Sequence, residues 1–356
     1  MLLQKLDPCD LTIFDSICVN TKSNFLQSGF WGVFKSCFGW KAHYFLADKM
    51  PLLVLSRPLA AGLGFAYIPW GPQLAVELAA SDHTANTALQ ELALALKQVL
   101  PKSTAFIRFD PPWFTAENGG SAWQERRLQM PFKHAAADIQ APDTVLIDLS
   151  PAEDHILAQM KSKCRYNIRL GSKKVKIRNA PADELPVFYE IFKETSRRDG
   201  IAIHNINYYA TLFDTIYAWK NKNNASAPDI RLYLADYEGV TIAGIITLFW
   251  NGHSTYLYGA SSNLHRNVMA PYALQWQAMR DAKACSCTVY DLFGIPPNGN
   301  SAHPMAGLYR FKTGFGGTII HRPGSWDFAY KPILTAAFHS AEGLRKKIRD
   351  LKKQRC

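Results

Sequence analysis

Apolar and polar residues alternate along this chain in a way that predicts the same elements in each half. In the first half, residues 51–72 contain two apolar runs around a turn-prone centre, which predicts two strands. Residues 82–100 then show the spacing of an amphipathic helix, which Asp82 or Thr84 is placed to cap. Residues 103–113 predict a short strand that ends at prolines. We therefore expect a strand, strand, helix, strand unit here.

The second half repeats this order. Residues 231–262 predict three strands, and the Asn251-Gly252 pair between the second and the third is typical of a hairpin turn. Residues 270–285 predict a helix, and residues 287–295 predict a closing strand. The same order thus recurs about 180 residues along the chain, which favours two copies of one α/β unit.

Helical patterns fill the region between the two copies. They cover residues 152–174, 182–200 and 208–219, and Gly200 is placed to end the second helix. Prolines and a capping serine within residues 141–154 mark the expected domain boundary.

With a pair of helices before it, this strand order is that of the GNAT acetyltransferase fold. The sequence therefore predicts an α/β protein with mixed sheets, in two tandem GNAT-like domains. Domain 1 is expected over residues 1–149, completed by 318–356, and domain 2 over 150–317. In that fold a glycine-patterned loop and a helix N-terminus bind the pyrophosphate of coenzyme A. The corresponding loops, 67–84 and 258–275, lack the glycine spacing, so neither coenzyme A nor another cofactor is expected.

Composition limits the class of protein. The chain is 48% hydrophobic and 19% charged, as in globular proteins, and no apolar run reaches the roughly 18 residues that a transmembrane helix needs. The N-terminus lacks the basic-then-apolar order of a signal peptide, so we expect a cytoplasmic protein. Cys285 and Cys287 have no second ligand pair nearby, and no metal site is expected.

The charge is strongly positive and uneven. A net charge of +11 suits nucleic acid, a phosphorylated substrate or a membrane surface, although a basic protein without a charged partner is the alternative. Residues 161–178 contain eight cations and no acid. The tail, residues 345–355, is also basic. Leu344, Ile348 and Leu351, directly before and within it, have the spacing of one helix face, so we expect a terminal helix. Its cations either face solvent or contact phosphates or anionic lipid.

A set of motifs in order along nearly the whole chain resembles the Fem family of peptidoglycan peptidyltransferases, which includes the FemX, FemA and FemB types. Each motif is weak alone, and the ordered set is specific. The motifs are "FLQSGFWGVFK" (25–35), "YIPWGP" (67–72), "FIRFDP" (106–111), "KSKCRYNIRLGSKK" (161–174), "YLYGASSNLHRNVMAPYALQW" (256–276), "YDLFGI" (290–295) and "GLYRFKTGFGG" (307–317). The length is closest to the FemX type and leaves no room for a long coiled-coil arm.

The resemblance implies an activity. Such enzymes take an amino acid from aminoacyl-tRNA and add it to the side-chain amine of the stem peptide, in a UDP-linked or lipid-linked muramyl pentapeptide. Both substrates are polyanions, which accounts for the positive charge. We expect a cytoplasmic monomer that contacts the inner membrane face through its basic C-terminal helix. Two alternatives stay open: an N-acyltransferase that uses acyl-CoA or an acyl carrier, and a non-catalytic RNA- or membrane-binding protein.

The implied reaction is aminolysis of an ester, so the site must position two reactants and stabilise an oxyanion. The resemblance places Phe311 and Lys312, in a glycine-rich segment expected to be a loop, where the tRNA end enters. Phe311 would stack on a base, and Lys312 would neutralise either a phosphate or the oxyanion. The alternative is a lysine that extends to solvent from a tight strand turn.

The resemblance also implies acceptor contacts. Lys35 corresponds to a lysine that holds nucleotide phosphates, unless it is an ordinary surface lysine. His204 and Tyr208 correspond to an arginine and a tyrosine of the FemX type, and a histidine lacks the bidentate grip of arginine. Tyr256 is a further contact, and Tyr258 is expected next to it on the same strand face.

Three more residues have open roles. Asp110 corresponds to an aspartate proposed as the general base, or it simply ends a strand. Arg165 and Arg169 either bind tRNA or lie on a solvated basic helix face. Asn167, in the middle of the same helix, indicates a specific hydrogen bond, because asparagine disfavours helix interiors.

Overall fold

The computed structural model divides the chain into two compact units. Unit 1 comprises Met1–Thr115, Ala122–Pro142 and His321–Cys356, and unit 2 comprises Ala116–Ser121 and Asp143–Ile320. Each unit is built around one mixed sheet, as expected for tandem GNAT-like domains. Within these ranges the structure describes all residues except 8, 10, 60–61, 76–77, 79–80, 117–126, 223–226, 297–298, 301–304 and 355–356, with side chains up to residue 345.

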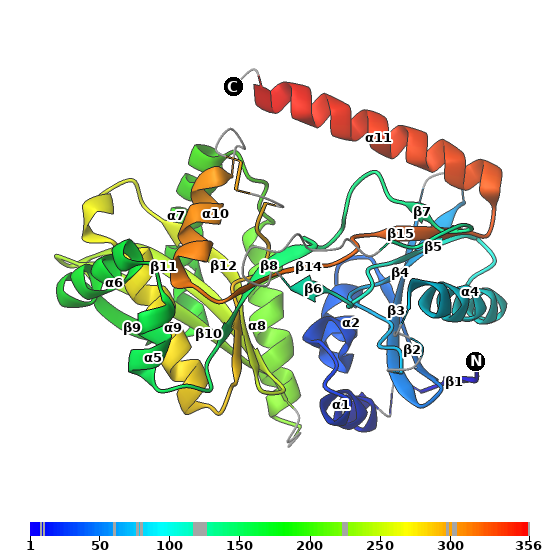
Figure 1. Cartoon of the computed structure of the whole chain (residues 1–356), viewed down its shortest axis with the longest axis horizontal. Helices are drawn as coiled ribbons and strands as arrows, with labels where there is room; N and C mark the ends of the chain where they lie inside the picture. The colour runs from blue at the N-terminus through cyan, green and yellow to red at the C-terminus, as the bar shows by residue number, and fades with distance from the viewer. Residues whose placement is uncertain are drawn as a thin grey trace. The chain divides into compact units, whose positions relative to one another are not determined.

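Unit 1 has a sheet in the order β1-β2-β3-β4-β5-β15-β7, whose strands lie side by side in Figure 1. Only the central β4–β5 pair is parallel among the pairs described in this sheet. Its elements are β1 (Leu3–Lys5), α1 (Leu11–Asn20), η2 (Phe25–Gln27), α2 (Gly29–Ser36), β2 (Lys41–Ala47), β3 (Met50–Pro58), β4 (Gly64–Ile68), α4 (Asp82–Val99), β5 (Thr104–Phe109), β7 (Lys133–His134), β15 (Trp326–Ala329) and α11 (Pro332–Gln354).

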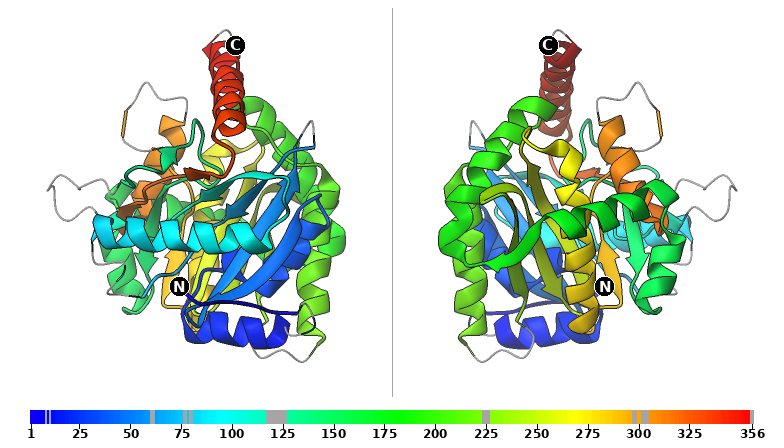
Figure 2. Two further views of the ribbon diagram at one scale, coloured as in Figure 1. Left: turned by 90° about the vertical axis from the view of Figure 1, so that its right-hand side faces the viewer. Right: turned by 90° about the vertical axis from the view of Figure 1, so that its left-hand side faces the viewer.

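Helix α4 connects the parallel strands β4 and β5 and lies across one face of the sheet (Figure 2, left). Its apolar stripe, including Leu89, Leu92 and Leu96, packs with the strands in the core of unit 1. The N-cap of α4 is neither Asp82 nor Thr84, the two residues predicted for it. Ser81 is the N-cap: its side chain accepts a hydrogen bond from the Thr84 N–H, and the Thr84 hydroxyl accepts one from the Ser81 N–H, which forms a capping box.

The C-terminal segment joins unit 1 through a buried ion-pair network. Arg108 on β5 makes two hydrogen bonds to Asp327 on β15 and two to Glu342 on α11. Phe338 packs its ring 5.0 Å from that of Phe106. The expected terminal helix is therefore present, and these contacts fix its first half to the sheet.

Unit 2 has a sheet in the order β6-β14-β8-β13-β12-β11-β10-β9, in which β12 and β13 are parallel. The three strands expected within residues 231–262 are confirmed. The elements are β6 (Thr115–Ala116), β8 (Asp143–Asp148), α5 (Glu153–Gln159), α6 (Ser162–Lys174), β9 (Lys176–Ala180), η3 (Ala182–Glu184), α7 (Leu185–Asp199), α8 (Ile206–Lys220), β10 (Asp229–Tyr237), β11 (Val240–Trp250), β12 (His253–Ser261), η4 (Arg266–Val268), α9 (Ala270–Ala284), β13 (Val289–Asp291), α10 (Ala306–Lys312), η5 (Thr313–Phe315) and β14 (Thr318–His321).

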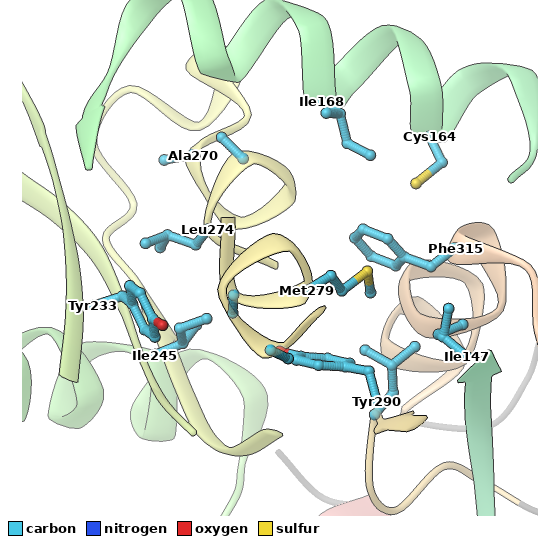
Figure 3. Close-up of a cluster of buried hydrophobic side chains, with 14 of the residues drawn as sticks. Ile147, Cys164, Ile168, Tyr233, Ile245, Ala270, Leu274, Met279, Tyr290 and Phe315 are labelled. Atoms are coloured by element: carbon cyan, nitrogen blue, oxygen red, sulfur yellow. The ribbon is translucent and has the colours of Figure 1, made fainter. Parts of the chain in front are cut away.

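The two faces of this sheet carry different helices. Tyr233 and Ile245 point into a cluster with Ile168 of α6 and Leu274 of α9 (Figure 3). On the opposite face, Gly244 of β11 lies against Phe188 of α7. The sheet is thus enclosed by α6 and α9 on one side and by α7 on the other.

Two sequence expectations need correction. Residues 152–174 are not one helix, because Met160 is extended and the backbone N–H of Lys161 donates to Gly314 (2.9 Å) outside the helix. The segment 307–317 is not a loop but mostly helical, with Gly316 and Gly317 following at positive φ. A Cβ on Gly316 would lie 2.6 Å from the carbonyl oxygen of Gln159, so the glycine permits close backbone approach.

The described helices bear on two further expectations. The longest of them in unit 2 have 15 residues, so a long coiled-coil arm is absent from the part of this unit that the structure describes. Nowhere in the described chain is a helix both long and apolar enough to cross a bilayer.

Candidate functional site

Lys312 occupies a buried position at the end of α10, with only 5% of the residue exposed. Its ammonium donates to the carbonyl oxygens of Phe293 (3.1 Å) and Gly294 (2.9 Å). Nζ also lies 5.3 Å from the ring centroid of Tyr256. The alternative of a lysine that reaches solvent from a strand turn is therefore wrong.

The carbonyls that hold Lys312 belong to a strained turn after β13. Phe293 has φ of 57°, which is uncommon for a bulky residue. Asp291 stabilises this turn by accepting a hydrogen bond from the Phe293 N–H (2.7 Å), and it also accepts one from Thr144. The "YDLFGI" segment thus forms the cradle of the lysine, a role that sequence reasoning missed.

The surroundings of Lys312 in this cradle favour the neutral form of its amine. Burial lowers the pKa of Lys312 to about 7, and the nearby Asp291 carboxylate partly opposes this shift. An ammonium has three N–H donors, and two are used by the carbonyls. Lys312 can therefore present one N–H toward a negative charge, or exchange a proton near neutral pH.

Tyr256 and Tyr258 do not share a strand face, contrary to expectation. A β-bulge lies between them, because Tyr256 pairs with Thr247 and Tyr258 with Ile246, the adjacent residue. Tyr256 consequently packs with the α9 side of the sheet, where Lys312 lies. The ring of Tyr256 also covers Gly259, where a Cβ would coincide with the tyrosine hydroxyl.

Tyr258 lies instead in an aromatic group with His204 and Tyr208. The His204 ring stacks on Tyr208 with centroids 3.9 Å apart. Burial raises the pKa of Tyr258, and the nearby Tyr208 raises it as well. Tyr209 adds an edge contact to Tyr258 at 4.9 Å. His204 is exposed directly before the N-terminus of α8, which Asn205 caps. Three of the four predicted acceptor residues of unit 2 therefore form one group.

Phe311 is half-buried beside Lys312. Its ring meets Tyr272 (4.9 Å) and Phe315 (5.3 Å) edge to face. Asn167 of α6 lies beside Tyr272 and partly offsets the rise in the Tyr272 pKa that burial causes. The specific hydrogen bond that its mid-helix position indicated stays a prediction. Phe311 is thus held by the packing between α6, α9 and η5.

The two arginines of α6 differ in their surroundings. The guanidinium of Arg165 donates to the backbone carbonyls of Met160 and Ala158, at the break between α5 and α6. Arg169 is exposed and makes no ion pair with a described residue. Only Arg169 therefore presents its charge fully to solvent.

Unit 1 contains a second cationic group. Lys35 ends α2, with Nζ 5.8 Å from the ring centroid of Trp31 and 5.9 Å from that of Phe34. Burial and, to a smaller extent, the positive charge of Arg57 lower the pKa of Lys35 to about 8. Arg57 is exposed on β3 above the ring of Trp40 (5.7 Å). Sequence reasoning missed Arg57, because only the fold brings two cations close together.

Asp110 follows β5 and is fully enclosed. Its carboxylate accepts hydrogen bonds from the hydroxyls of Tyr67 and Ser325. Burial raises the pKa of Asp110 to about 6, although both hydrogen bonds act in the opposite direction. This pKa suits a base, but the two hydroxyls already occupy the carboxylate, and its catalytic role stays a prediction.

Metal-ligating side chains do not gather anywhere in the described residues. The groups described above supply a buried amine, phenols, cations and a carboxyl.

Comparisons with known proteins agree with this arrangement. The sequence pattern of the FemAB family matches residues 14–224 and 230–343. A Lipid II:glycine glycyltransferase of Staphylococcus epidermidis is 22% identical, and the match covers 75% of this chain and 78% of that protein. The Staphylococcus aureus protein of the same name is also 22% identical, over 69% of this chain and 74% of its own.

Solved structures show the same fold. The crystal structure of FemX superposes with a TM-score of 0.77 at 18% identity, over 95% of this chain and 100% of that one. The C-terminal domain of a putative lysylphosphatidylglycerol synthetase from Agrobacterium fabrum gives a TM-score of 0.51 at 8% identity, over 90% and 92%.

Proposed function

Because this chain belongs to the FemAB family, we propose that it is a transferase that adds an amino acid to a peptidoglycan precursor during synthesis of the interpeptide bridge. The related staphylococcal proteins are named for glycyl transfer to lipid II, which supports a cell-wall precursor as acceptor. The donor we propose is an aminoacyl-tRNA, and the acceptor is the side-chain amine of a muramyl pentapeptide, UDP-linked or lipid-linked.

The observation that carries this proposal is the buried ammonium of Lys312, held by two carbonyls with one N–H left over. In aminolysis the acceptor nitrogen bonds to the ester carbonyl carbon, and the carbonyl oxygen becomes an oxyanion. The oxyanion then returns to a carbonyl as the bond to the ribose oxygen of the tRNA breaks, and the proton lost by the nitrogen passes to that ribose oxygen. A fixed donor in a site shielded from water stabilises the oxyanion strongly, because little reorganisation is needed.

Each unit, taken by itself, carries groups that match the chemistry of the acceptor. Lys35 and Arg57 in unit 1 would bind phosphate oxygens. The positive charge of Arg57 lowers the pKa of Lys35, and a phosphate bound between the two cations would offset this repulsion. In unit 2, His204 lies next to the N-terminus of α8, where the helix dipole favours an anion. On one face of the unit 2 sheet, Tyr208 and Tyr258 would contact the acceptor next to His204, and on the opposite face Tyr256 would contact it beside Lys312.

We propose that the protein is a monomer and binds both substrates in the cytoplasm. Its basic C-terminal segment, 345–355, would contact the inner face of the membrane when the acceptor is lipid-linked.

A transfer assay tests the proposal. The protein is incubated with tRNAs charged with single radiolabelled amino acids, and with UDP-linked or lipid-linked muramyl pentapeptide. We expect label to appear in one acceptor with one or a few tRNAs. Turnover of acetyl-CoA without transfer from any charged tRNA would replace the proposal by an acyl-CoA-dependent activity. Absence of both reactions, with RNA or lipid binding retained, would indicate a binding protein.

A further inference from the structure

Helix α6 presents one exposed face, of which only Arg169 has been considered so far. Lys163, Tyr166, Arg169 and Lys173 recur every three or four residues and are all exposed, and Tyr166 is 63% exposed. The opposite side of the helix is buried through Cys164, Asn167, Ile168 and Gly171. We call the four exposed side chains the α6 face.

The positive charge of the α6 face is not neutralised locally. Helix α6 contains no acidic residue, and none of the three cations of the face makes an ion pair with a described residue. Arg178, on the next strand, shows the contrast, because it pairs with both Glu184 and Asp236. A run of cations without acids on one helix face is the electrostatic pattern of a surface that binds a polyanion.

The packing of α6 connects this face to the buried lysine site within unit 2. The N–H of Lys161, directly before the helix, donates to Gly314 (2.9 Å), two residues after Lys312. In the middle of the helix, Asn167 lies beside Tyr272, whose ring contacts Phe311. The α6 face thus lies on the outer side of a helix whose inner side supports Phe311.

We propose that the α6 face binds the phosphate backbone of the donor RNA and that Tyr166 stacks on an unpaired base next to its end. This inference rests on the proposed function, because it takes the donor to be RNA. Cations separated by one helical turn suit successive phosphates, and an exposed aromatic ring among them is a base-stacking surface. Arg165 is not part of this surface, since its guanidinium is bound to the backbone at Met160 and Ala158.

A membrane surface fits the α6 face less well. Helices that lie in a lipid interface insert large apolar side chains between the headgroups. Among the described residues of α6, Tyr166 is the one large hydrophobic side chain that is exposed, and its hydroxyl is polar. We therefore take RNA as the partner and make anionic lipid an outcome of the test.

The test uses the full chain and an RNA minihelix without an attached amino acid, which has a tRNA acceptor stem and a single-stranded CCA end. Binding is measured by fluorescence anisotropy at several salt concentrations. For the double variant Arg169→Ala/Lys173→Ala we expect at least tenfold weaker binding at low salt. We also expect the slope of log K against log salt to fall by about one to two, as two phosphate contacts are lost. The matched control, Lys102→Ala/Lys133→Ala, removes two exposed cations of unit 1 and should keep wild-type binding.

Tyr166 is tested separately. We expect Tyr166→Ala to weaken minihelix binding about fivefold or more and Tyr166→Phe to restore it, because stacking needs the ring and not the hydroxyl. The slope with salt should stay unchanged in both. All substituted side chains are exposed, so thermal unfolding should match wild type. If a variant unfolds early, the arginine and lysine positions are changed to glutamine instead, and Tyr166→Ala is replaced by Tyr166→Leu, which also lacks the ring.

The outcomes separate this inference from the proposed function. If wild type transfers an amino acid from tRNA and the α6 variants keep their minihelix affinity, the α6 face is not the RNA surface, although the function stands. If wild type binds the minihelix through the α6 face but transfers from no charged tRNA, the surface stands and the function falls. If the variants lose binding to phosphatidylglycerol vesicles and not to the minihelix, the partner is a membrane and the inference is overturned.

Discussion

Lys312 and Tyr256 form a cation–π pair, with the ammonium nitrogen 5.3 Å from the ring centroid. The pair joins the end of α10 to the bulged part of β12 and encloses the amine between a ring face and two carbonyl oxygens. Such an enclosure excludes water, and it makes both the charge and the position of the amine sensitive to small changes around it.

The first prediction concerns the amine itself. Lys312→Ala should lower kcat/KM by about two to three orders of magnitude, the scale of one lost oxyanion donor. Arg310→Ala is the matched control, because Arg310 is a cation on the same helix and is exposed. Steady-state transfer from charged tRNA is the measurement. Near-wild-type transfer by Lys312→Ala would remove this residue from the mechanism.

The second prediction concerns stability against pH. Burial lowers the pKa of Lys312 from 10.5 to about 7, so between these values the unfolded chain binds more protons than the folded protein. The contribution of Lys312 to the free energy of unfolding must then rise with pH across that range. Lys312→Met removes the titration. We expect the stability of this variant relative to wild type to be highest below pH 7 and to fall toward pH 10.5.

Denaturant unfolding at a series of pH values measures this difference, with Arg310→Met as control. A constant difference between Lys312→Met and wild type would mean that the folded protein keeps Lys312 charged at the ordinary pKa.

The third prediction concerns Gly259, a positioning residue. A Cβ at this position would coincide with the hydroxyl of Tyr256, so Gly259→Ala should displace the ring that covers Lys312. We expect kcat to fall about tenfold or more while RNA affinity is unchanged, and the pH profile of kcat to shift because the amine becomes more hydrated. Gly307→Ala is the control, since its Cβ would meet nothing within 4 Å. Equal activity of the two variants would contradict the idea.

The fourth prediction concerns the cation pair of unit 1. Lys35→Ala should raise the KM for the acceptor about tenfold, the value of one charge-assisted hydrogen bond, and leave RNA affinity unchanged. Arg57→Ala should have a smaller effect that disappears at high salt, because Arg57 is exposed. Calorimetric titration with UDP tests the phosphate contact directly, and Lys102→Ala provides a control. A loss of RNA binding in Lys35→Ala would assign this group to the donor.

The fifth prediction concerns Asp110, which accepts hydrogen bonds from Tyr67 and Ser325. We expect Ser325→Ala to destabilise the protein by about 1–3 kcal/mol, since it removes one partner of a buried carboxyl. Asp110→Asn should likewise lower the unfolding midpoint while kcat changes little. A large loss of kcat in Asp110→Asn at wild-type stability would instead support the general-base role.

The sequence by itself determined most of the element types and the family to which the chain belongs. Repeated strand and helix patterns, with short turns such as Asn251-Gly252, depend on local periodicity and turn chemistry, which are properties of neighbouring residues. The ordered motifs also singled out Lys312, His204 and Tyr208, and the structure stacks the last two against each other.

Tertiary structure decided which of these residues work together. A single-residue bulge sends Tyr256 and Tyr258 to opposite faces, and no local pattern reveals it because the bulge depends on pairing with β11. The break before α6 depends on a hydrogen bond to Gly314, more than a hundred residues further along the chain. The lowered pKa of Lys312 likewise follows from burial among groups distant in sequence. Side-chain identity is local, whereas register, burial and charge proximity arise only when remote segments pack.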